Sequence, residues 1–370
     1  MIHGSENQKA NGSGERDALR LKTVMKKRLA KIVRAVIFLA ALFVMINCAN
    51  NVLRQTEDRY NREMFPAFYA EEKNSIDVVT IGSSACYQYV NNPVLYEKYG
   101  ITSFNLSTAL QPPSIAGAIM DEAEKTQNPA LYVVEVREYL HMKEKQRTKS
   151  VFCVTDSMDL SLNKWKLICR AYPDASRWVS EFLDITKYHG KWTSVPKEAL
   201  SYIWNRVPSL KKTWRNRMVV QPQNPPAMPD ELEPLSLSEL NRKDLVDLLK
   251  ACREKNREVL FVLMPYIHGS KIPGQALTLQ QIVEEYGYQF LNLADPALCP
   301  MDYSRDFYNK YHVNAWGSEK VTEALGAYIR EQYGLAIPHT PSAEASWDAA
   351  VAANRAEMDA AGPYGENQKT

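Results

Sequence analysis

The stretch IDVVTIGSSA, residues 76–85, decides the fold class of this chain. Its first six residues are almost all β-branched, and Gly82 ends the run. A short, continuous apolar run that stops at a glycine is typical of a strand buried on both faces, as in a parallel sheet. We therefore expect a buried strand here, followed at Ser83 and Ser84 by a strand-to-helix turn.

Further runs of this kind alternate with helical patterns along the chain. Apolar strands that alternate with amphipathic helices predict a parallel sheet with both faces covered. We therefore expect an α/β fold, a flavodoxin-like three-layer sandwich with a five-stranded parallel sheet. The other four strands are expected at 102–106, 131–136, 258–264 and 288–293, and the helices near 112–126, 237–256, 275–286 and 315–333.

Residues 140–235 interrupt this alternation. They hold five of the seven tryptophans and end near the proline-rich QPQNPPAMP, residues 221–229. We interpret them as a mostly helical insertion over the carboxyl edge of the sheet, where α/β proteins bind ligands. The tryptophans are expected to form the core of this cap rather than a platform for sugars. The domain should span residues 75–335, and 336–370 should be a peripheral tail.

The N-terminal region predicts one membrane segment. Seven basic residues and no acidic residue lie between Arg20 and Arg34, and the uncharged run AVIFLAALFVMINCA follows at 35–49. This pattern predicts a disordered cytoplasmic tail at 1–31, a single-pass anchor in the bilayer at 32–53 and an external stalk at 54–74, which places the C-terminal domain outside the cell membrane. The alternative is a signal peptide cleaved near Cys48-Ala49, which we consider less favoured.

The composition excludes several classes of protein. Lys and Arg number 45 against 43 Asp and Glu, whereas a nucleic-acid-binding domain usually has a clear basic excess. The 45% of hydrophobic residues exceeds what a disordered chain contains. The six cysteines form no CxxC or Cys/His spacing, so neither a metal site nor a disulfide framework is predicted.

Two residues stand out as candidates for chemistry. Ser84 follows the first strand, where a hydroxyl points out at the carboxyl edge of the sheet. His312 lies in the stretch DFYNKYHVNAWGSEK, residues 306–320, just before the last helix of the domain. A histidine there can accept a serine proton if the two side chains come within hydrogen-bond distance. Singly, each also fits an ordinary role, as a helix cap or a surface histidine.

Together these elements resemble the SGNH/GDSL hydrolase superfamily. The resemblance rests on IGSSA at 81–85, FNLSTALQ at 104–111 and FYNKYHVNAWG at 307–317. The motifs VTDSMDLSLNKWKLI at 154–168 and YHGKW at 188–192 resemble a branch of membrane-anchored bacterial surface proteins, which includes accessory proteins of teichoic-acid D-alanylation and alginate O-acetylation. The resemblance implies a partner of the membrane-bound O-acyltransferase type.

The resemblance also assigns roles to individual residues. It implies that Ser84 is the nucleophile, with Ser83 in place of the usual aspartate, and that Ser107 supplies an amide to the oxyanion hole. The third family motif, Gly-x-Asn-Asp, is absent, because Arg137 and Glu138 follow the third strand. Gln111 or Arg137 is the candidate for the missing oxyanion donor.

The same resemblance makes His312 the general base and exposes one departure. Asn309 stands where the family has the aspartate that orients the histidine. Replacing this acid by asparagine in a serine-protease triad lowers turnover by about 10⁴. Three possibilities follow: Asp306 replaces the missing acid, the Ser-His pair acts slowly on its own, or the domain has lost catalysis and binds only.

These observations lead to two hypotheses. The first is a surface-anchored acyl-ester transferase or esterase that acts on a cell-surface polysaccharide or other acylated polymer and needs no metal or organic cofactor. The second is an inactive relative that binds polysaccharide or holds a membrane-bound O-acyltransferase. The distance between Ser84 Oγ and His312 Nε2 separates them, because proton transfer requires hydrogen-bond contact.

Overall fold

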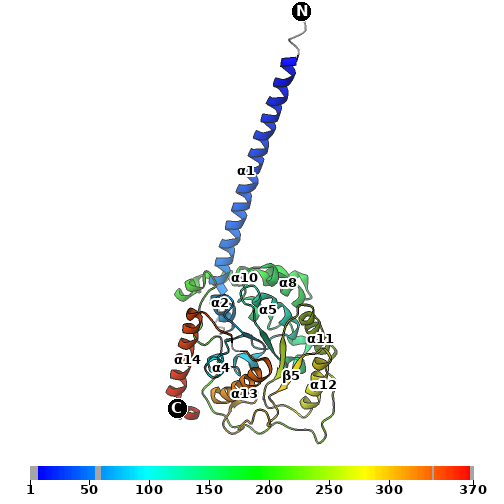
Figure 1. Ribbon diagram of the computed structural model, residues 1–370, viewed down its shortest axis with the longest axis vertical. Helices are drawn as coiled ribbons and strands as arrows, with labels where there is room; N and C mark the ends of the chain where they lie inside the picture. The colour runs from blue at the N-terminus through cyan, green and yellow to red at the C-terminus, as the bar shows by residue number, and fades with distance from the viewer. Residues whose placement is uncertain (1–6, 55–59, 336, 367–370) are drawn as a thin grey trace, which may run out of the picture. The chain divides into compact units, whose positions relative to one another are not determined.

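The structure is a computed structural model that describes residues 7–54, 60–335 and 337–366, with only the backbone of residues 7–18, 60 and 61. Its contacts divide the chain into two units, Met1–Asn50 and Asn51–Thr370. The second unit contains the sheet and all candidate site residues, and the described residues of the first, from Asn7 on, belong to the long N-terminal helix (Figure 1).

A five-stranded, fully parallel sheet forms the centre of the second unit, which confirms the predicted α/β class. The strands lie in the order β2-β1-β3-β4-β5. Residues Val78 to Gly82 of β1 pair with Ser103 to Ser107 of β2, so these two strands end level with each other. The strands are β1 Val78–Gly82, β2 Ser103–Ser107, β3 Leu131–Glu135, β4 Val259–Leu263 and β5 Gln289–Asn292.

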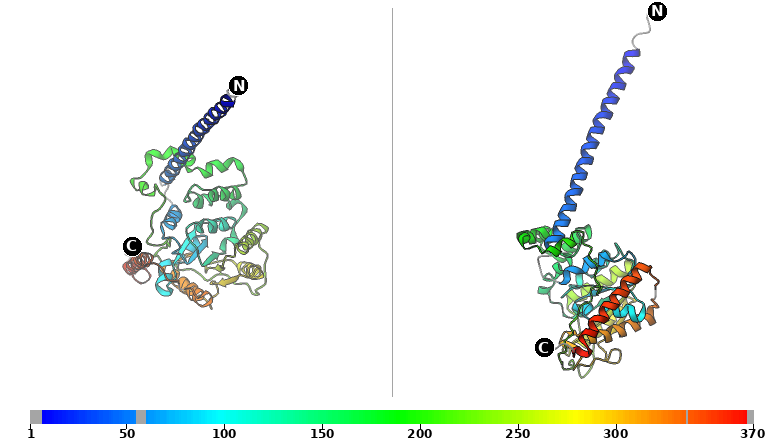
Figure 2. Two further views of the ribbon diagram at one scale, coloured as in Figure 1. Left: turned by 45° about the horizontal axis from the view of Figure 1, so that its top comes forward. Right: turned by 90° about the vertical axis from the view of Figure 1, so that its left-hand side faces the viewer.

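Helices cover both faces of this sheet, as its strand pattern requires (Figures 1 and 2). Alternate residues of one strand enter different cores: Val79 packs into one hydrophobic cluster and Val78 into the other. The first cluster includes side chains of α2 Met64–Ala70, α5 Ala116–Ala123, α11 Glu239–Glu254 and α12 Ile272–Glu285. The second includes side chains of α4 Asn92–Tyr99 and α13 Ala315–Tyr333.

The insertion divides into helices and an extended part, and the prediction that it covers the carboxyl edge of the sheet holds for only some of it. Most of the helices pack beside α5, where Asn163 Nδ2 donates to the Ala118 carbonyl at 3.0 Å. The start of the insertion, with His141 and Gln146, and its extended part lie at the carboxyl edge, where Arg215 N donates to the Tyr87 carbonyl at 2.8 Å. The elements are α6 Arg137–His141, η4 Glu144–Gln146, α7 Val151–Thr155, α8 Leu162–Ala171, η5 Ala175–Arg177, α9 Trp178–Phe182, α10 Asp184–Tyr188, η6 His189–Ser194 and η7 Lys197–Tyr202.

The tryptophans of the insertion also divide. Trp165 packs edge-on against Trp178, with ring centroids 6.1 Å apart, and these two agree with the expected cap core. Trp214 is buried instead against α13, outside the core of the insertion. Trp192 and Trp204, however, are exposed.

The N-terminal region differs from the expected boundaries. Helix α1 runs from Asn7 to Leu53, so much of the tail expected to be disordered is helical. Its Leu19–Leu53 part is long and apolar enough to cross a membrane, with a mean hydropathy of 2.4 in its most apolar window. The expected stalk is instead part of the domain: η2 Tyr60–Glu63 leads into α2, whose apolar residues from Met64 to Tyr69 are buried. Residues 55–59 lie outside the described part.

The C-terminal tail is ordered as well, contrary to expectation. Residues Pro341–Ala361 form helix α14, which packs on α4, and η8 Pro363–Gly365 follows it (Figure 1). The ring of Trp347 is fully buried, 5.4 Å from the ring of Tyr96. The alanine-rich composition that suggested a loose segment is that of a helix held to the domain by a few larger residues, among them Trp347 and Met358.

Candidate active site

The turn after β1 presents Ser84 at the carboxyl edge of the sheet. Ser83 caps the short helix α3 Ser84–Tyr87, and its Oγ accepts from the amide of Ala85. Gly82 allows this turn to pass close to β3, because a Cβ at this position would lie 2.8 Å from Cβ of Glu135. Ser84 itself is 8% exposed, so its hydroxyl is held in a largely dry environment.

A tight hairpin presents His312. Strand β6 Phe307–Asn309 pairs antiparallel with β7 His312–Val313, so that Asn309 lies directly opposite His312. The Nδ1 atom of His312 lies 3.2 Å from Asn309 Oδ1, which also accepts from the amide of Tyr311 at 2.8 Å. Because Asn309 Oδ1 is an amide oxygen, it can only accept hydrogen bonds. The hydrogen between it and His312 therefore lies on Nδ1, which leaves Nε2 with a free lone pair.

The serine and the histidine meet directly. Ser84 Oγ is 2.7 Å from His312 Nε2, which is within the distance that proton transfer requires. One Nη atom of Arg137, at the start of α6, donates to Ser84 Oγ at 3.0 Å. The hydroxyl can therefore give its proton to the histidine while the guanidinium stabilises negative charge on Oγ.

Arg137 also fixes the hairpin relative to the serine. Its other Nη donates to the carbonyl of Tyr311 at 2.8 Å, and Tyr89 Oη donates to the same carbonyl at 2.8 Å. Glu135 accepts from Ser83 Oγ at 2.9 Å and from the Arg137 amide at 2.7 Å. The nucleophile turn, β3 and the histidine hairpin are thus joined through the hydrogen bonds of Glu135 and Arg137.

Burial and two nearby positive charges disfavour protonation of His312. Burial, reinforced by the positive charges of Arg137 and Arg217, lowers the pKa of His312 to about 3. Its ring stacks on that of Tyr308, with centroids 5.6 Å apart, and Asn309 supplies no negative charge. Each pKa unit corresponds to ~1.4 kcal/mol, so the free site disfavours imidazolium by several kcal/mol. His312 is neutral at pH 7, as a base must be, but it is a weak base.

Asp306 does not take the place of the missing acid, contrary to the hypothesis from the sequence. Its carboxylate accepts from Lys320 Nζ at 2.6 Å and from the amide of Asp302 at 2.7 Å. It precedes the hairpin and is fully buried against α13, where its carbonyl accepts from Asn314. The hairpin register explains the difference, because it brings Asn309 rather than Asp306 opposite the histidine.

A cavity of about 770 Å³ opens beside Ser84 and His312. Arg137 and Asn309 line it too, whereas Ser107 and Gln111 are not among its lining residues. Gln111 Nε2 is occupied by the carbonyl of Leu106. The expected roles of Ser107 and Gln111 in the oxyanion hole therefore find no support in the cavity, and Arg137 is the side chain that contacts the nucleophile.

Other lining residues were not anticipated from the sequence. Glu138 is almost fully buried, and burial raises its pKa to about 7 against the opposing charge of Arg137. His141 Nε2 lies 2.7 Å from Tyr266 Oη, and His268 follows on the same loop after β4. The rule that ligand sites lie at the carboxyl ends of parallel strands could have identified the loop after β4.

The described residues contain no cluster of three or more His, Cys, Asp or Glu side chains suited to a metal ion. Ser84 as a nucleophile, neutral His312 as a base and the Arg137 guanidinium lie around one cavity, an arrangement that can carry out nucleophilic catalysis. Neither a protein-family model nor a curated protein sequence matches this chain. The assignment therefore depends on the geometry of the site.

Proposed function

We propose that this protein is a membrane-anchored acyl-ester transferase or esterase of SGNH type, which acts on a polysaccharide or other polymer at the cell surface. The observation that carries the proposal is the 2.7 Å contact between Ser84 Oγ and His312 Nε2, with Arg137 donating to the same oxygen. A serine with a neutral histidine as its base is the arrangement expected for nucleophilic acyl transfer.

In the proposed reaction, Ser84 Oγ attacks the carbonyl carbon of an ester while its proton moves to His312 Nε2. The bond to the leaving alcohol then breaks, and His312 returns the proton to that alcohol, which leaves an acyl-serine. A hydroxyl of the acceptor polymer, or water in an esterase, loses a proton to His312 and attacks the acyl-serine. Ser84 recovers its proton, so no oxidant, metal or cofactor takes part.

Several features support the wider assignment. The strand order β2-β1-β3-β4-β5 is the one expected for a flavodoxin-like sandwich, and the serine comes first and the histidine last in the chain. The basic flank before the apolar part of α1 favours a cytoplasmic N-terminus and an external domain. An external position would give the cavity access to cell-surface polymer and to a membrane-bound O-acyltransferase as partner.

One observation favours a second candidate, a domain that binds the polymer without catalysis. His312 faces an amide instead of a carboxylate, and burial lowers its pKa to about 3. Imidazolium must form during acyl transfer, so the reaction depends on negative charge that develops on the substrate and is balanced by Arg137. A domain that had lost catalysis would carry the same asparagine.

Labelling with a fluorophosphonate probe tests the proposal. The wild type should be labelled at Ser84, and Ser84→Ala should abolish labelling. Ser107→Ala is the matched control, because this buried hydroxyl has no hydrogen-bond partner and does not line the cavity. Absence of labelling in a folded wild type, together with retained binding of surface polymer, would support the binding protein instead.

A further inference from the structure

We propose that residues 189–206 form a surface that rests on the lipid bilayer crossed by α1, with Trp192, Leu200 and Trp204 in the interfacial layer. We call these residues the interfacial segment. The proposal relies on the membrane anchor of the proposed function but not on its chemistry.

The interfacial segment exposes an unusual amount of aromatic surface. Trp192 is 71% exposed, Trp204 67% and Leu200 64%. Tryptophan is enriched where membranes meet water, because its ring is amphipathic and its N–H needs a polar partner. The other tryptophans of the insertion are at least partly buried, so the exposure is confined to this segment.

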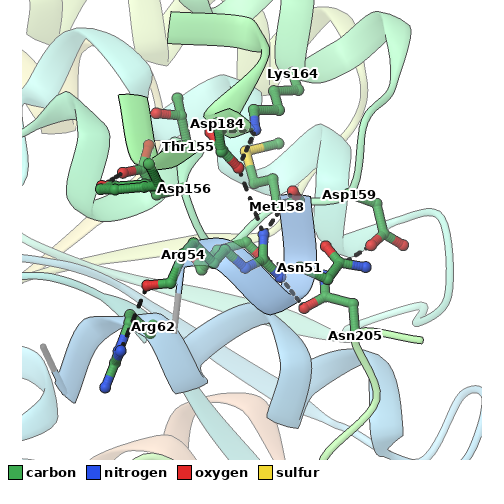
Figure 3. A network of polar contacts seen from close by, with 12 residues as sticks. Asn51, Arg54, Arg62, Thr155, Asp156, Met158, Asp159, Lys164, Asp184 and Asn205 are labelled. Carbon is green, nitrogen blue, oxygen red and sulfur yellow. Dashed lines mark hydrogen bonds and ion pairs between the residues drawn. The ribbon is translucent and has the colours of Figure 1, made fainter. Parts of the chain in front are cut away.

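Contacts within the second unit place this segment beside the end of the candidate membrane helix. Asn51 Nδ2 donates to the carbonyl of Ile203 at 3.2 Å, and Arg54 donates to Asn205 Oδ1 (Figure 3). The apolar stretch able to cross a membrane ends at Leu53, between these two contacts. If α1 spans the bilayer, chain continuity brings Trp204 to the level at which the helix leaves it.

A buried ionic network holds Arg54, the residue directly after α1, inside the insertion. Arg54 is 1% exposed, donates to the carbonyl of Met158 at 3.2 Å and lies 3.9 Å from Asp184 (Figure 3). Lys164 also contacts Asp184, at 3.2 Å, with both side chains fully buried. Removing one partner of such a network leaves a buried charge uncompensated, which is strongly destabilising. Within the second unit, the residues that follow the candidate membrane segment are therefore held against the insertion.

The charge of the segment fits a lipid surface better than a protein partner. Lys191, Lys197 and Arg206 flank the exposed apolar residues, and Glu198 is the one acidic residue of the segment, although Arg206 is also paired with Asp159 at 3.0 Å. Basic residues beside tryptophan suit an anionic headgroup layer. Trp192 and Leu200 lie on two separate 3-10 turns and Trp204 on the turn that follows, instead of on one helix face, the usual surface for a partner helix.

Fluorescence quenching by brominated lipid tests this proposal with the full-length protein. All seven tryptophans lie at or beyond position 165, so the membrane helix contributes no signal. In nanodiscs whose phosphatidylcholine is brominated near the headgroup, wild-type emission should fall relative to unlabelled lipid. The double variant Trp192→Phe/Trp204→Phe should lose this quenching, whereas Trp316→Phe, a buried control, should retain it.

Two further measurements make the outcome decisive. Equal quenching in the wild type and the double variant, or none in the wild type, would overturn the proposal. Alkaline carbonate extraction of the same preparations separates a failed anchor from a failed surface, since an inserted α1 remains with the lipid. Should the double variant misfold, the single variants Trp192→Phe and Trp204→Phe decide: a partial loss of bromine quenching in either supports the proposal, and full quenching in both contradicts it.

Discussion

Two opposing electrostatic requirements meet at Ser84. Arg137 donates to Ser84 Oγ and thereby favours negative charge on the attacking oxygen. The same guanidinium, 6% exposed, helps to lower the pKa of His312 and so disfavours the imidazolium that must form next. In a Ser-His-Asp triad the acid resolves this conflict. Here Asn309 orients the ring and fixes its tautomer but leaves the charge uncompensated.

The substitution Asn309→Asp should therefore increase activity. A carboxylate at Nδ1 raises the pKa of His312, because a nearby negative charge favours imidazolium. We expect hydrolysis of an aryl acetate to rise at least about tenfold, within the ~10⁴ that the acid contributes elsewhere. The wild-type rate should stay level down to about pH 4 and fall towards pH 3, and the variant should lose activity at higher pH.

Asn309→Ala is the control for this experiment, since it removes the acceptor that fixes the tautomer and should lower the rate. The rate of Asn309→Asp could also stay unchanged although its carboxylate is shown to face His312. This result would indicate that formation of the imidazolium does not limit the rate of acyl transfer.

Asp306→Asn should affect stability and leave the histidine unchanged. The variant loses the charge attraction to Lys320 but keeps an acceptor for the amide of Asp302. Because Lys320 is partly exposed, we expect a loss of about 1 kcal/mol in the free energy of unfolding. Urea unfolding and an NMR titration of His312 measure both effects. A clear fall in the His312 pKa would assign Asp306 to the triad after all.

At the scale of elements, the sequence predicts what local pattern determines. The five strands and the helices from residue 239 to 333 follow from uninterrupted apolar runs and helical periodicity, and their bounds agree within a few residues. The β6–β7 hairpin has strands of three and two residues, too short for any periodicity. Its register decides which residue faces His312; the family resemblance placed Asn309 there, but no pattern in the residues themselves excluded Asp306.

Elements held by tertiary contacts were predicted least well. Residues 64–69 looked like an exposed stalk because charged residues surround them, but their apolar side chains fill a gap beside β2 and α5. Helix α14 was missed because its many small residues give little hydrophobic signal. In both cases the determining information is the surface against which the element packs, which one stretch of sequence does not contain.

Trp347→Ala should detach α14 from the domain. The ring is fully buried, and the Lys212 ammonium lies 4.8 Å from its centroid. Truncating a buried tryptophan costs about 3–5 kcal/mol, so urea unfolding should show a loss of that size. Trp347→Phe should reduce the free energy of unfolding much less, because phenylalanine keeps a buried aromatic ring. It also removes a buried indole N–H that has no acceptor. Fluorophosphonate labelling of Ser84 should persist in both, because α14 does not line the cavity.

At the scale of the whole molecule, the buried network at Arg54 joins the residues that directly follow the candidate membrane segment to the insertion. Arg54 and Asn51 both contact the insertion, whose extended part continues to Arg217 at the cavity. Residues Asn51 to Arg54 are thus part of the folded unit that carries the site.

The charges that precede the apolar part of α1 predict on which side of the membrane the domain lies. Between Arg20 and Arg34 there are seven basic residues and no acidic residue, and positive flanks remain in the cytoplasm. Protease added to intact spheroplasts should therefore digest a C-terminal tag and the Ser84 domain, while a tag before residue 7 survives until the membrane is permeabilised. Replacing Lys26, Lys27 and Arg28 by glutamate should produce a fraction of inverted molecules.

A protected C-terminal tag in the wild type would contradict the orientation and exclude a surface polymer as substrate. It would leave the chemistry of Ser84 and His312 intact, because that chemistry depends on contacts within the domain.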